Sequence, residues 1–149
     1  MTTTVLTTDR IVLRGTARAR EGAGVEAARL LEAAGAVTPA YESAMTERES
    51  LVSTYMGNYL AIPHGTNEAK EAILASAMTL VRYEQPLDWD GNEVRVVAAI
   101  AGKEGGHMSV LSALAMVFSD DAAVEQVLAA ETPEAVLALL GDVNDAVDE

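Results

Sequence analysis

Apolar positions in the first third of the chain recur at helical spacing. Between residues 24 and 34 they return every three or four positions, which predicts a helix, and Gly35 directly after them is typical of a helix C-cap. Thr38 followed by Pro39 predicts the start of a second helix, with Thr38 as its N-cap, and this helix is expected to end around Glu49. Two consecutive helices are therefore predicted in this part of the chain.

The last third of the chain predicts three further helices. The first is expected to start close to His107 and carries apolar residues at helical spacing as far as Phe118. The second begins with two aspartates and covers residues 120–130. The third repeats the arrangement of a capping residue before a proline, with Thr132 as the cap, and leads into residues 135–140.

Four segments are predicted to be strands. Residues 9–13 form a short apolar piece suited to a sheet edge, and residues 59–62 form a buried strand. Residues 73–83 and 94–100 are rich in apolar and β-branched side chains, and the polar link 86–92 between them contains an Asp-Gly pair that suits a long hairpin. Strands interleaved with helices indicate an α/β domain with a mixed sheet.

Length, charge and composition bound the class of protein. One domain is expected in 149 residues, with its core over residues 9–140 and an acidic tail over residues 141–149. A net charge of −13 argues against a nucleic-acid partner, whose phosphates would be repelled. The absence of cysteine excludes disulfides and thiolate chemistry. No apolar run approaches the ~18 residues that cross a bilayer and no secretory signal is evident, so a soluble cytoplasmic protein is expected.

The candidate chemistry centres on His64, one of two histidines in the chain. It follows an apolar run and lies between Pro63, which restricts the backbone, and Gly65, which lacks a Cβ that would crowd an approaching molecule. An imidazole that titrates near neutrality is a poor choice for filling space, so the position suits a nucleophile at a strand end. A structural histidine in a turn is the alternative.

His107 and Arg48 are the candidate partners of His64. The predicted helix N-terminus at His107 favours an anion and keeps an imidazole neutral. Arg48 is expected near the end of a helix shortly before the His64 strand, and its guanidinium can bind two phosphate oxygens. Two imidazoles and an arginine suit a phosphoryl acceptor. Since the chain has no nucleotide-binding glycine loop, the expected donor is a phosphorylated protein or small phosphate compound, and no cofactor is expected.

Other interpretations of these residues stay open. Arg48 could pair with a surface glutamate, and His107 could be an ordinary helix residue. The histidines could bind zinc with Glu68 or Glu104, although no metal-ligand spacing supports such a site and no metal is expected. Five methionines are expected to fill the core: Met45, Met56, Met78, Met108 and Met116. For Met56 and Met108, the alternative is a place on a partner-binding surface.

Four stretches of the chain form a specific combination when taken in order. They are Ala44-Met45-Thr46-Glu47-Arg48-Glu49, Thr54-Tyr55-Met56-Gly57-Asn58, Ala61-Ile62-Pro63-His64-Gly65-Thr66 and His107 to Ala115. This combination resembles the enzyme IIA domain of the mannitol/fructose class of the bacterial sugar phosphotransferase system. The resemblance covers about Asp9 to Leu140, nearly the whole chain.

This resemblance implies a fold and a set of roles. The fold would be a mixed, five-stranded sheet flanked by helices, in a three-layer α/β/α sandwich. His64 would accept a phosphoryl group at Nε2 from the phosphocarrier protein HPr and pass it to a cysteine of a IIB domain, which phosphorylates the incoming sugar. Arg48 and His107 would bind the phosphoryl oxygens. Because the chain has neither a cysteine nor a spanning segment, IIB and the membrane permease IIC would be separate polypeptides and the chain a free-standing IIA subunit.

Some positions depart from the family pattern, and others indicate which subtype of the family the chain resembles. Tyr59 replaces a residue that is commonly small, and Gly105-Gly106 form a looser approach to His107, which would weaken its preorganisation. Thr66 with Glu68-Ala69-Lys70 favours mannitol-type relatives over fructose-type or nitrogen-regulatory ones.

Two other functions are compatible with the sequence. In the first, the chain is a regulatory IIA-like protein, and the phosphorylation state of His64 controls binding to a target by like-charge repulsion. In the second, it is a ligand-binding α/β domain with structural histidines.

Overall fold

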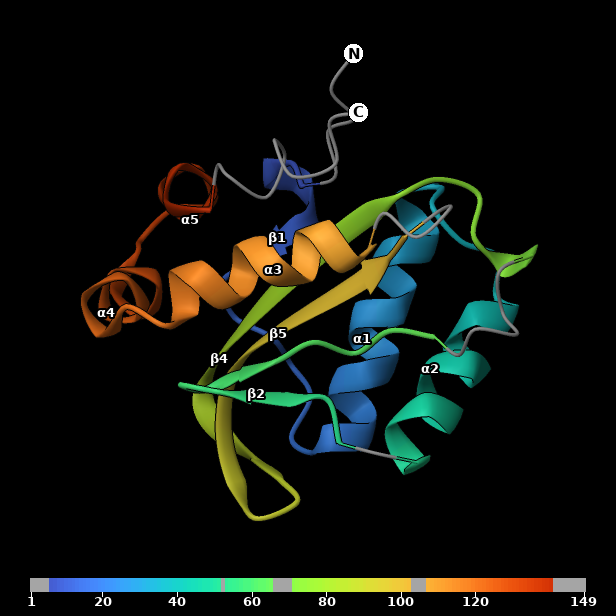
Figure 1. The fold of residues 1–149 in the computed structure, drawn as a ribbon, viewed down its shortest axis with the longest axis horizontal. Helices are drawn as coiled ribbons and strands as arrows, with labels where there is room; N and C mark the ends of the chain where they lie inside the picture. The colour runs from blue at the N-terminus through green and yellow to red at the C-terminus, as the bar shows by residue number, and fades with distance from the viewer. Residues whose placement is uncertain (1–5, 52, 66–70, 103–106, 141–149) are drawn as a thin grey trace.

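The computed structural model describes residues 6–51, 53–65, 71–102 and 107–140, with only the backbone described at residues 107–109. Its centre is a five-stranded sheet with strand order β1-β4-β5-β3-β2 (Figure 1). The strands are β1 (Ile11–Val12), β2 (Tyr55–Gly57), β3 (Leu60–Ala61), β4 (Ala77–Trp89) and β5 (Asn92–Ala101). The helices are the 3-10 helix η1 (Thr8–Arg10), α1 (Arg20–Ala33), α2 (Ala40–Leu51), α3 (His107–Phe118), α4 (Asp121–Ala129) and α5 (Pro133–Leu139).

The long hairpin of β4 and β5 forms the centre of the sheet (Figure 1). Its antiparallel strands are joined at Asp90 and Gly91, whose φ angles are 54° and 89°. Positive φ at both central residues is the geometry of a type I′ turn, which Asp-Gly favours. The predicted link over residues 86–92 is too long, because the buried side chains of Leu87 and Trp89 extend β4 to the turn itself.

The outer strands make the sheet mixed, as predicted. β1 is parallel to β4 and β3 is parallel to β5, whereas β2 is antiparallel to β3. The edge strand β1 is shorter than predicted, since Asp9 belongs to η1. β4 begins at Ala77 and not at residue 73, because Ile73 forms an isolated bridge with Val37 instead. The sequence predicts no strand at β2, where only three residues are paired.

Helix α1 begins earlier than predicted but ends where predicted. It starts at Arg20, ahead of two glycines that obscure the apolar pattern. At its end Gly35 has a φ of 76°, its N–H donates to the Glu32 carbonyl, and the Ala36 N–H donates to the Leu31 carbonyl, both at 3.0 Å. This pair of bonds is a Schellman motif, which needs a residue that tolerates positive φ. The predicted C-cap glycine is confirmed.

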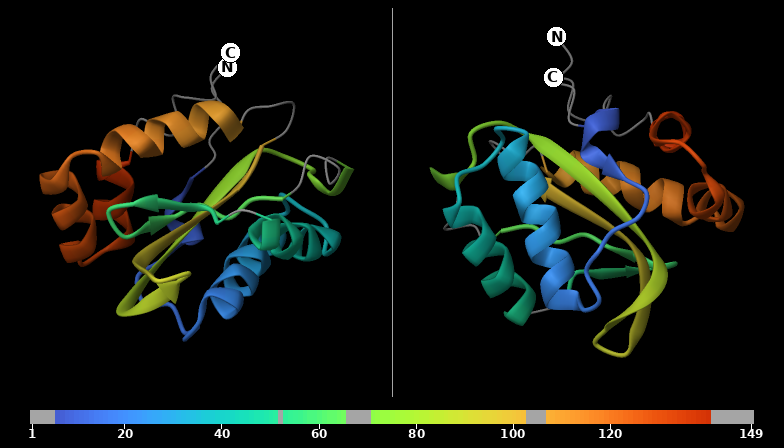
Figure 2. Two further views of the ribbon diagram at one scale, coloured as in Figure 1. Left: turned by 60° about the horizontal axis from the view of Figure 1, so that its bottom comes forward. Right: turned by 180° about the vertical axis from the view of Figure 1, so that it is seen from behind.

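Helices cover both faces of the sheet, so the predicted three-layer arrangement is confirmed. α1 and α2 lie on one face and α3, α4 and α5 on the other (Figure 2). Alternate residues of β5 point to opposite layers: Val96, Ala98 and Ile100 belong to the core beneath α3–α5, and Val97 and Ala99 to the core beneath α1 and α2. Because β5 is buried on both faces, its side chains are mostly apolar. This explains the hydrophobic run from which the strand was predicted.

The C-terminal helices start with the predicted caps. The Asp120 carboxylate accepts from the Ala122 N–H at the start of α4, and the Thr132 hydroxyl accepts from the Ala135 N–H at the start of α5. α2 begins at Ala40, one residue after the predicted proline.

The methionines divide between the core and the surface. Met45 and Met78 are buried, as predicted, whereas Met56 is 46% exposed and Met116 is 75% exposed. Core placement of Met116 is therefore wrong. The reason is that α3 is apolar around most of its circumference, so that spacing alone does not show which side faces the sheet. The side chain of Met108 lies outside the described residues.

Candidate functional site

His64 directly follows the pairing of β3 with β5. β3 places Leu60 opposite Val96, and the pairing continues past Pro63, because Ile100 donates its N–H to the Pro63 carbonyl at 3.0 Å. His64 then forms an isolated parallel bridge with Ile100. The backbone at the imidazole is therefore anchored to the central hairpin. The residue lies at the end of a buried strand, as the sequence predicts.

A hydrogen bond to the backbone determines which ring nitrogen of His64 carries the hydrogen. Its Nδ1 lies 2.9 Å from the Ile62 carbonyl oxygen, and the side chain is half-buried. A carbonyl oxygen can only accept, so Nδ1 carries the hydrogen. In the neutral ring the lone pair is then on Nε2. This tautomer is the one in which Nε2 could act as a nucleophile.

Gly65 is required by packing against Tyr41. A Cβ at Gly65 would lie 2.6 Å from Cε1 of the Tyr41 ring, which leaves no room for any larger residue. The Gly65 N–H donates to the Tyr41 hydroxyl at 2.8 Å, and this hydroxyl donates to the Ile100 carbonyl at 2.9 Å. Burial raises the pKa of Tyr41, so its hydroxyl keeps the proton that it donates. This internal contact is a second reason for glycine here, and room for an approaching molecule stays a prediction.

The structure brings Arg48 and His64 to the same hollow. The hollow has a volume of about 330 Å³ and is lined by Arg48, Ser53, Thr54, Tyr55, Met56, Ile62, His64 and Leu111. Arg48 reaches it from the last turn of α2, and Leu111 from α3 on the other face of the sheet. The half-exposed Met56 lies on its wall, which fits the alternative of a partner-binding surface better than core filling.

His107 is the first residue of α3, as predicted. It precedes Leu111, which lines the hollow, by one helical turn. Its side chain lies outside the described residues, so its role stays a prediction.

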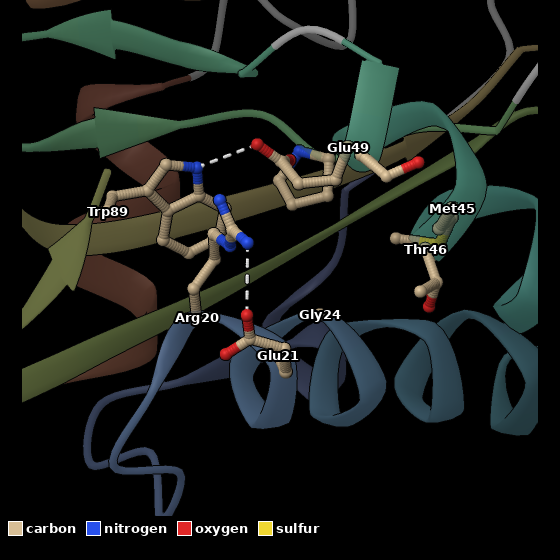
Figure 3. Close-up of a pocket in the computed structure, with 9 residues that line it drawn as sticks. Arg20, Glu21, Gly24, Met45, Thr46, Glu49 and Trp89 are labelled. Carbon is tan, nitrogen blue, oxygen red and sulfur yellow. Dashed lines mark hydrogen bonds and ion pairs between the residues drawn. The ribbon is translucent and has the colours of Figure 1, made fainter.

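Sequence reasoning missed the segment from Ser53 to Tyr55 and the role of Glu49. Ser53 and Thr54 line the hollow, but no strand is predicted at β2, and the sequence analysis assigns neither residue a place in the site. The Glu49 carboxylate bonds to Thr54. It also bonds to Trp89, which is 40 residues away (Figure 3). The only available signal was that Trp89 is the single tryptophan of the chain, whose N–H needs a partner once it is buried.

Neither a metal cluster nor a membrane helix occurs in the described part of the chain. Within it, no group of three or more His, Asp and Glu side chains could hold a metal ion. Glu68 and Glu104, the carboxylates considered for zinc, lie outside the described residues. No described helix is long and apolar enough to cross a membrane.

The arrangement of the hollow suits a phosphoryl group. The His64 imidazole, with its Nδ1 bonded to the Ile62 carbonyl, shares the cavity with the Arg48 guanidinium and the Ser53 hydroxyl. Guanidinium and hydroxyl groups are good donors to phosphate oxygens, and bidentate guanidinium bonds also orient them. The hollow is therefore equipped for attack on phosphorus and for binding of the transferred oxygens.

Comparisons with known proteins identify the family of the chain. Residues 4–143 match the family model "Phosphoenolpyruvate-dependent sugar phosphotransferase system, EIIA 2". The chain is 48% identical over 145 residues to the mannitol-specific phosphotransferase enzyme IIA component of Halalkalibacterium halodurans, covering 97% of this chain and 100% of that protein.

Solved structures agree with this match. The complex of enzyme IIAMTL and phosphorylated enzyme IIBMTL from Escherichia coli has a chain that matches with a TM-score of 0.87 and 30% identity, covering 92% of this chain and 97% of that one. Nitrogen regulatory protein IIA-Ntr from Neisseria meningitidis matches with a TM-score of 0.81 and 29% identity, covering 91% of this chain and 96% of that one.

The family resemblance found in the sequence is thereby confirmed. The family model spans nearly the whole chain, and the fold matches that of a solved relative with a TM-score of 0.87. The chain therefore belongs to the EIIA 2 family of the sugar phosphotransferase system and is a phosphotransferase of sugar transport.

Proposed function

We propose that Nε2 of His64 accepts a phosphoryl group from the phosphocarrier protein HPr and passes it to a cysteine of a IIB domain during mannitol uptake. The observation that carries the proposal is the bond from Nδ1 of His64 to the Ile62 carbonyl, within a hollow that Arg48 shares. With the hydrogen on Nδ1, the lone pair of the neutral ring is on Nε2, the atom proposed to attack phosphorus. Mannitol is inferred from the name of the Halalkalibacterium halodurans relative and from residues 66–70.

The first transfer step is a displacement at phosphorus. The Nε2 lone pair forms the new N–P bond as the N–P bond of the donor imidazole breaks, and the donor nitrogen keeps the bonding electrons. His64 retains its proton on Nδ1, so the phosphorylated ring becomes cationic. The Ile62 carbonyl, 2.9 Å from Nδ1, faces this charge and stabilises it.

The second step reverses the roles of the groups. A cysteine thiolate of IIB forms an S–P bond, the Nε2–P bond breaks, and His64 returns to its neutral form. This chain has no cysteine, so the thiol acceptor belongs outside its 149 residues. The solved complex of IIAMTL with phosphorylated IIBMTL supports a IIB partner.

Arg48 and His107 are proposed to bind the phosphoryl oxygens during both steps. Arg48 lines the hollow of His64, and its fork matches two oxygens at once. His107 begins α3, where unpaired backbone N–H groups favour an anion.

The test is incorporation of acid-labile phosphate from phospho-HPr, followed by transfer to IIB. The parent chain should be phosphorylated, His64→Ala should not, and Arg48→Ala should transfer about 100-fold more slowly in both directions while its unfolding transition is unchanged. Incorporation into His64→Ala at the parental rate would contradict the proposal. Phosphorylation of mannitol on addition of membranes that carry IIB and IIC tests the sugar.

A regulatory function is the second candidate. The match to nitrogen regulatory protein IIA-Ntr, with a TM-score of 0.81, shows that this fold also occurs in a regulatory protein. The phosphorylated and unphosphorylated chains should then differ in their binding to a target, because a dianion added at the hollow reverses the local charge. Affinity purification with both forms distinguishes the functions: a kinase or transcription factor retained by only one form supports regulation, and sugar phosphorylation with IIB supports transport.

A further inference from the structure

Glu49 joins three parts of the chain beside the hollow of His64. Its Oε2 accepts from the Thr54 N–H and from Nε1 of Trp89, both at 2.9 Å, and its Oε1 accepts from the Thr54 hydroxyl at 2.5 Å. Figure 3 shows the bond that the Trp89 indole makes to this carboxylate. Thr54 is 5% exposed and Trp89 1%. Three donors from largely buried residues thus converge on one side chain.

A continuous series of hydrogen bonds leads from Glu49 to the imidazole of His64. Thr54 is held by Glu49, and its carbonyl accepts the Ile62 N–H at 3.1 Å. The Ile62 carbonyl in turn accepts from Nδ1 of His64 at 2.9 Å. The series starts at a side-chain carboxylate, passes through the backbone of Thr54 and Ile62, and ends at the ring. The orientation of the reactive ring therefore depends on the Glu49 carboxylate.

The same residue also fixes the position of Arg48. The two are neighbours in the last turn of α2, and Glu49 anchors that turn to Thr54 and, through Trp89, to the central hairpin. A helix end frays unless it is held in this way. Glu49 itself lines a separate hollow of about 200 Å³, and not the one that contains His64. Its carboxylate is thus outside the proposed phosphoryl site, where a negative charge would oppose an anion.

We propose that Glu49 is a positioning residue for phosphoryl transfer, which sets the orientation of the His64 ring through Thr54 and Ile62 and the position of Arg48 through the end of α2. This rests on the proposed function of His64. A carboxylate suits the role because its two oxygens accept from three donors. A glutamine has one acceptor oxygen, so at least one donor would face its NH₂ group.

The variant Glu49→Gln tests the proposal, with Glu32→Gln as control. Glu32 is an exposed side chain of α1, so its replacement changes the net charge equally without touching the network. Glu49→Gln should slow transfer from phospho-HPr about tenfold per folded molecule, and the control should transfer at the parental rate. The signal of the single tryptophan, in fluorescence and in its indole N–H resonance, should shift in Glu49→Gln and not in the control.

The ring of His64 provides a readout that a purely structural role would not change. Nitrogen chemical shifts should show the form with hydrogen on Nδ1 in the parent and a mixture of both forms in Glu49→Gln. The chain has two histidines, so comparison with His64→Ala assigns the signals. This measurement needs no phosphate. It therefore decides the positioning proposal even if the parent takes up no phosphoryl group, a result that would overturn the proposed function instead.

Thr54→Val provides a second variant should Glu49→Gln fold poorly. It removes one donor with little change of shape, and it should show the same His64 shifts and slower transfer to a smaller extent. In the double variant the two effects should be less than additive, because both act through one network. Parental transfer rates with an altered Trp89 signal would overturn the proposal. So would slower transfer with an unchanged His64 ring, or fully additive effects.

Discussion

At the scale of single residues, the candidate site depends on backbone groups as much as on side chains. The Ile62 carbonyl selects the tautomer of His64, and the hydroxyl of Tyr41 connects the backbone of Gly65 to that of Ile100. A sequence names the side chains that can do chemistry. It does not show which carbonyl lies next to which ring, because that depends on the path of the backbone.

Gly65→Ala tests the contact with Tyr41. The added Cβ would lie within 3.2 Å of three atoms of a fully packed ring, so the loop after His64 has to move. We expect a loss of about 1–3 kcal/mol of unfolding free energy, together with slower phosphorylation of His64. Urea denaturation measures the first and phosphate incorporation the second. If Gly65→Ala is as stable as the parent, residue 65 and the Tyr41 ring can move apart without loss of unfolding free energy.

At the scale of elements, caps and turns follow local rules, whereas strand limits do not. Gly35, Asp120 and Thr132 end or start helices as predicted, because each acts within a few residues of itself. β2 and the limits of β4 depend on pairing partners elsewhere in the chain. Ile73 belongs to an apolar run like that of a strand, yet it pairs with Val37 and stays outside β4.

Gly24→Ala should stabilise helix α1. A Cβ at Gly24 meets no heavy atom within 4 Å, and alanine costs less backbone entropy than glycine in a helix interior. We expect a gain of about 0.5–1 kcal/mol in unfolding free energy, measured by urea denaturation.

Gly22→Ala is the matched control in the same helix. Its Cβ would lie 3.3 Å from Cβ of Ala17, so the gain should be smaller or absent. An equal gain at both positions would indicate that helix propensity alone decides the effect, and that the packing of Ala17 does not contribute.

At the scale of the whole molecule, the site lies where the two helical layers meet the sheet edge. Arg48 comes from α2 on one face and Leu111 from α3 on the other, with β2 and the end of β3 between them. Both layers must therefore be assembled before the hollow exists. Disruption of either core should impair the site even though the substituted residue is far from His64.

The Glu26 carboxylate joins further parts of the molecule and makes its stability sensitive to acid. Glu26 accepts hydrogen bonds from the Tyr83 hydroxyl at 2.6 Å, from the Thr16 N–H and hydroxyl, and from the Ala17 N–H. Burial alone would raise the pKa of Glu26, but these bonds outweigh it and lower the pKa below its ordinary value of 4.5. The unfolded chain therefore takes up the proton more readily than the folded one.

The stability that these bonds provide is fully present above about pH 4.5, the ordinary value, and is lost as the pH falls through the lowered pKa of the folded state. Glu26→Gln should be less stable than the parent at neutral pH, and the difference should narrow in acid. Melting temperatures of both proteins between about pH 7 and about pH 3 measure it. A constant difference across that range would show that the carboxylate charge has no part in the effect.

Local rules acting on the sequence determined most helix ends with their caps, the Asp-Gly hairpin and the α/β class, because each depends on residues close together in the chain. They also singled out Arg48 and His64 as candidates. The tertiary structure alone decided that these two share a hollow, that Nδ1 of His64 bonds to the Ile62 carbonyl, and that Glu49 meets Trp89. Those facts depend on contacts between residues distant in sequence. Such contacts form only when the sheet and both helical layers are packed together.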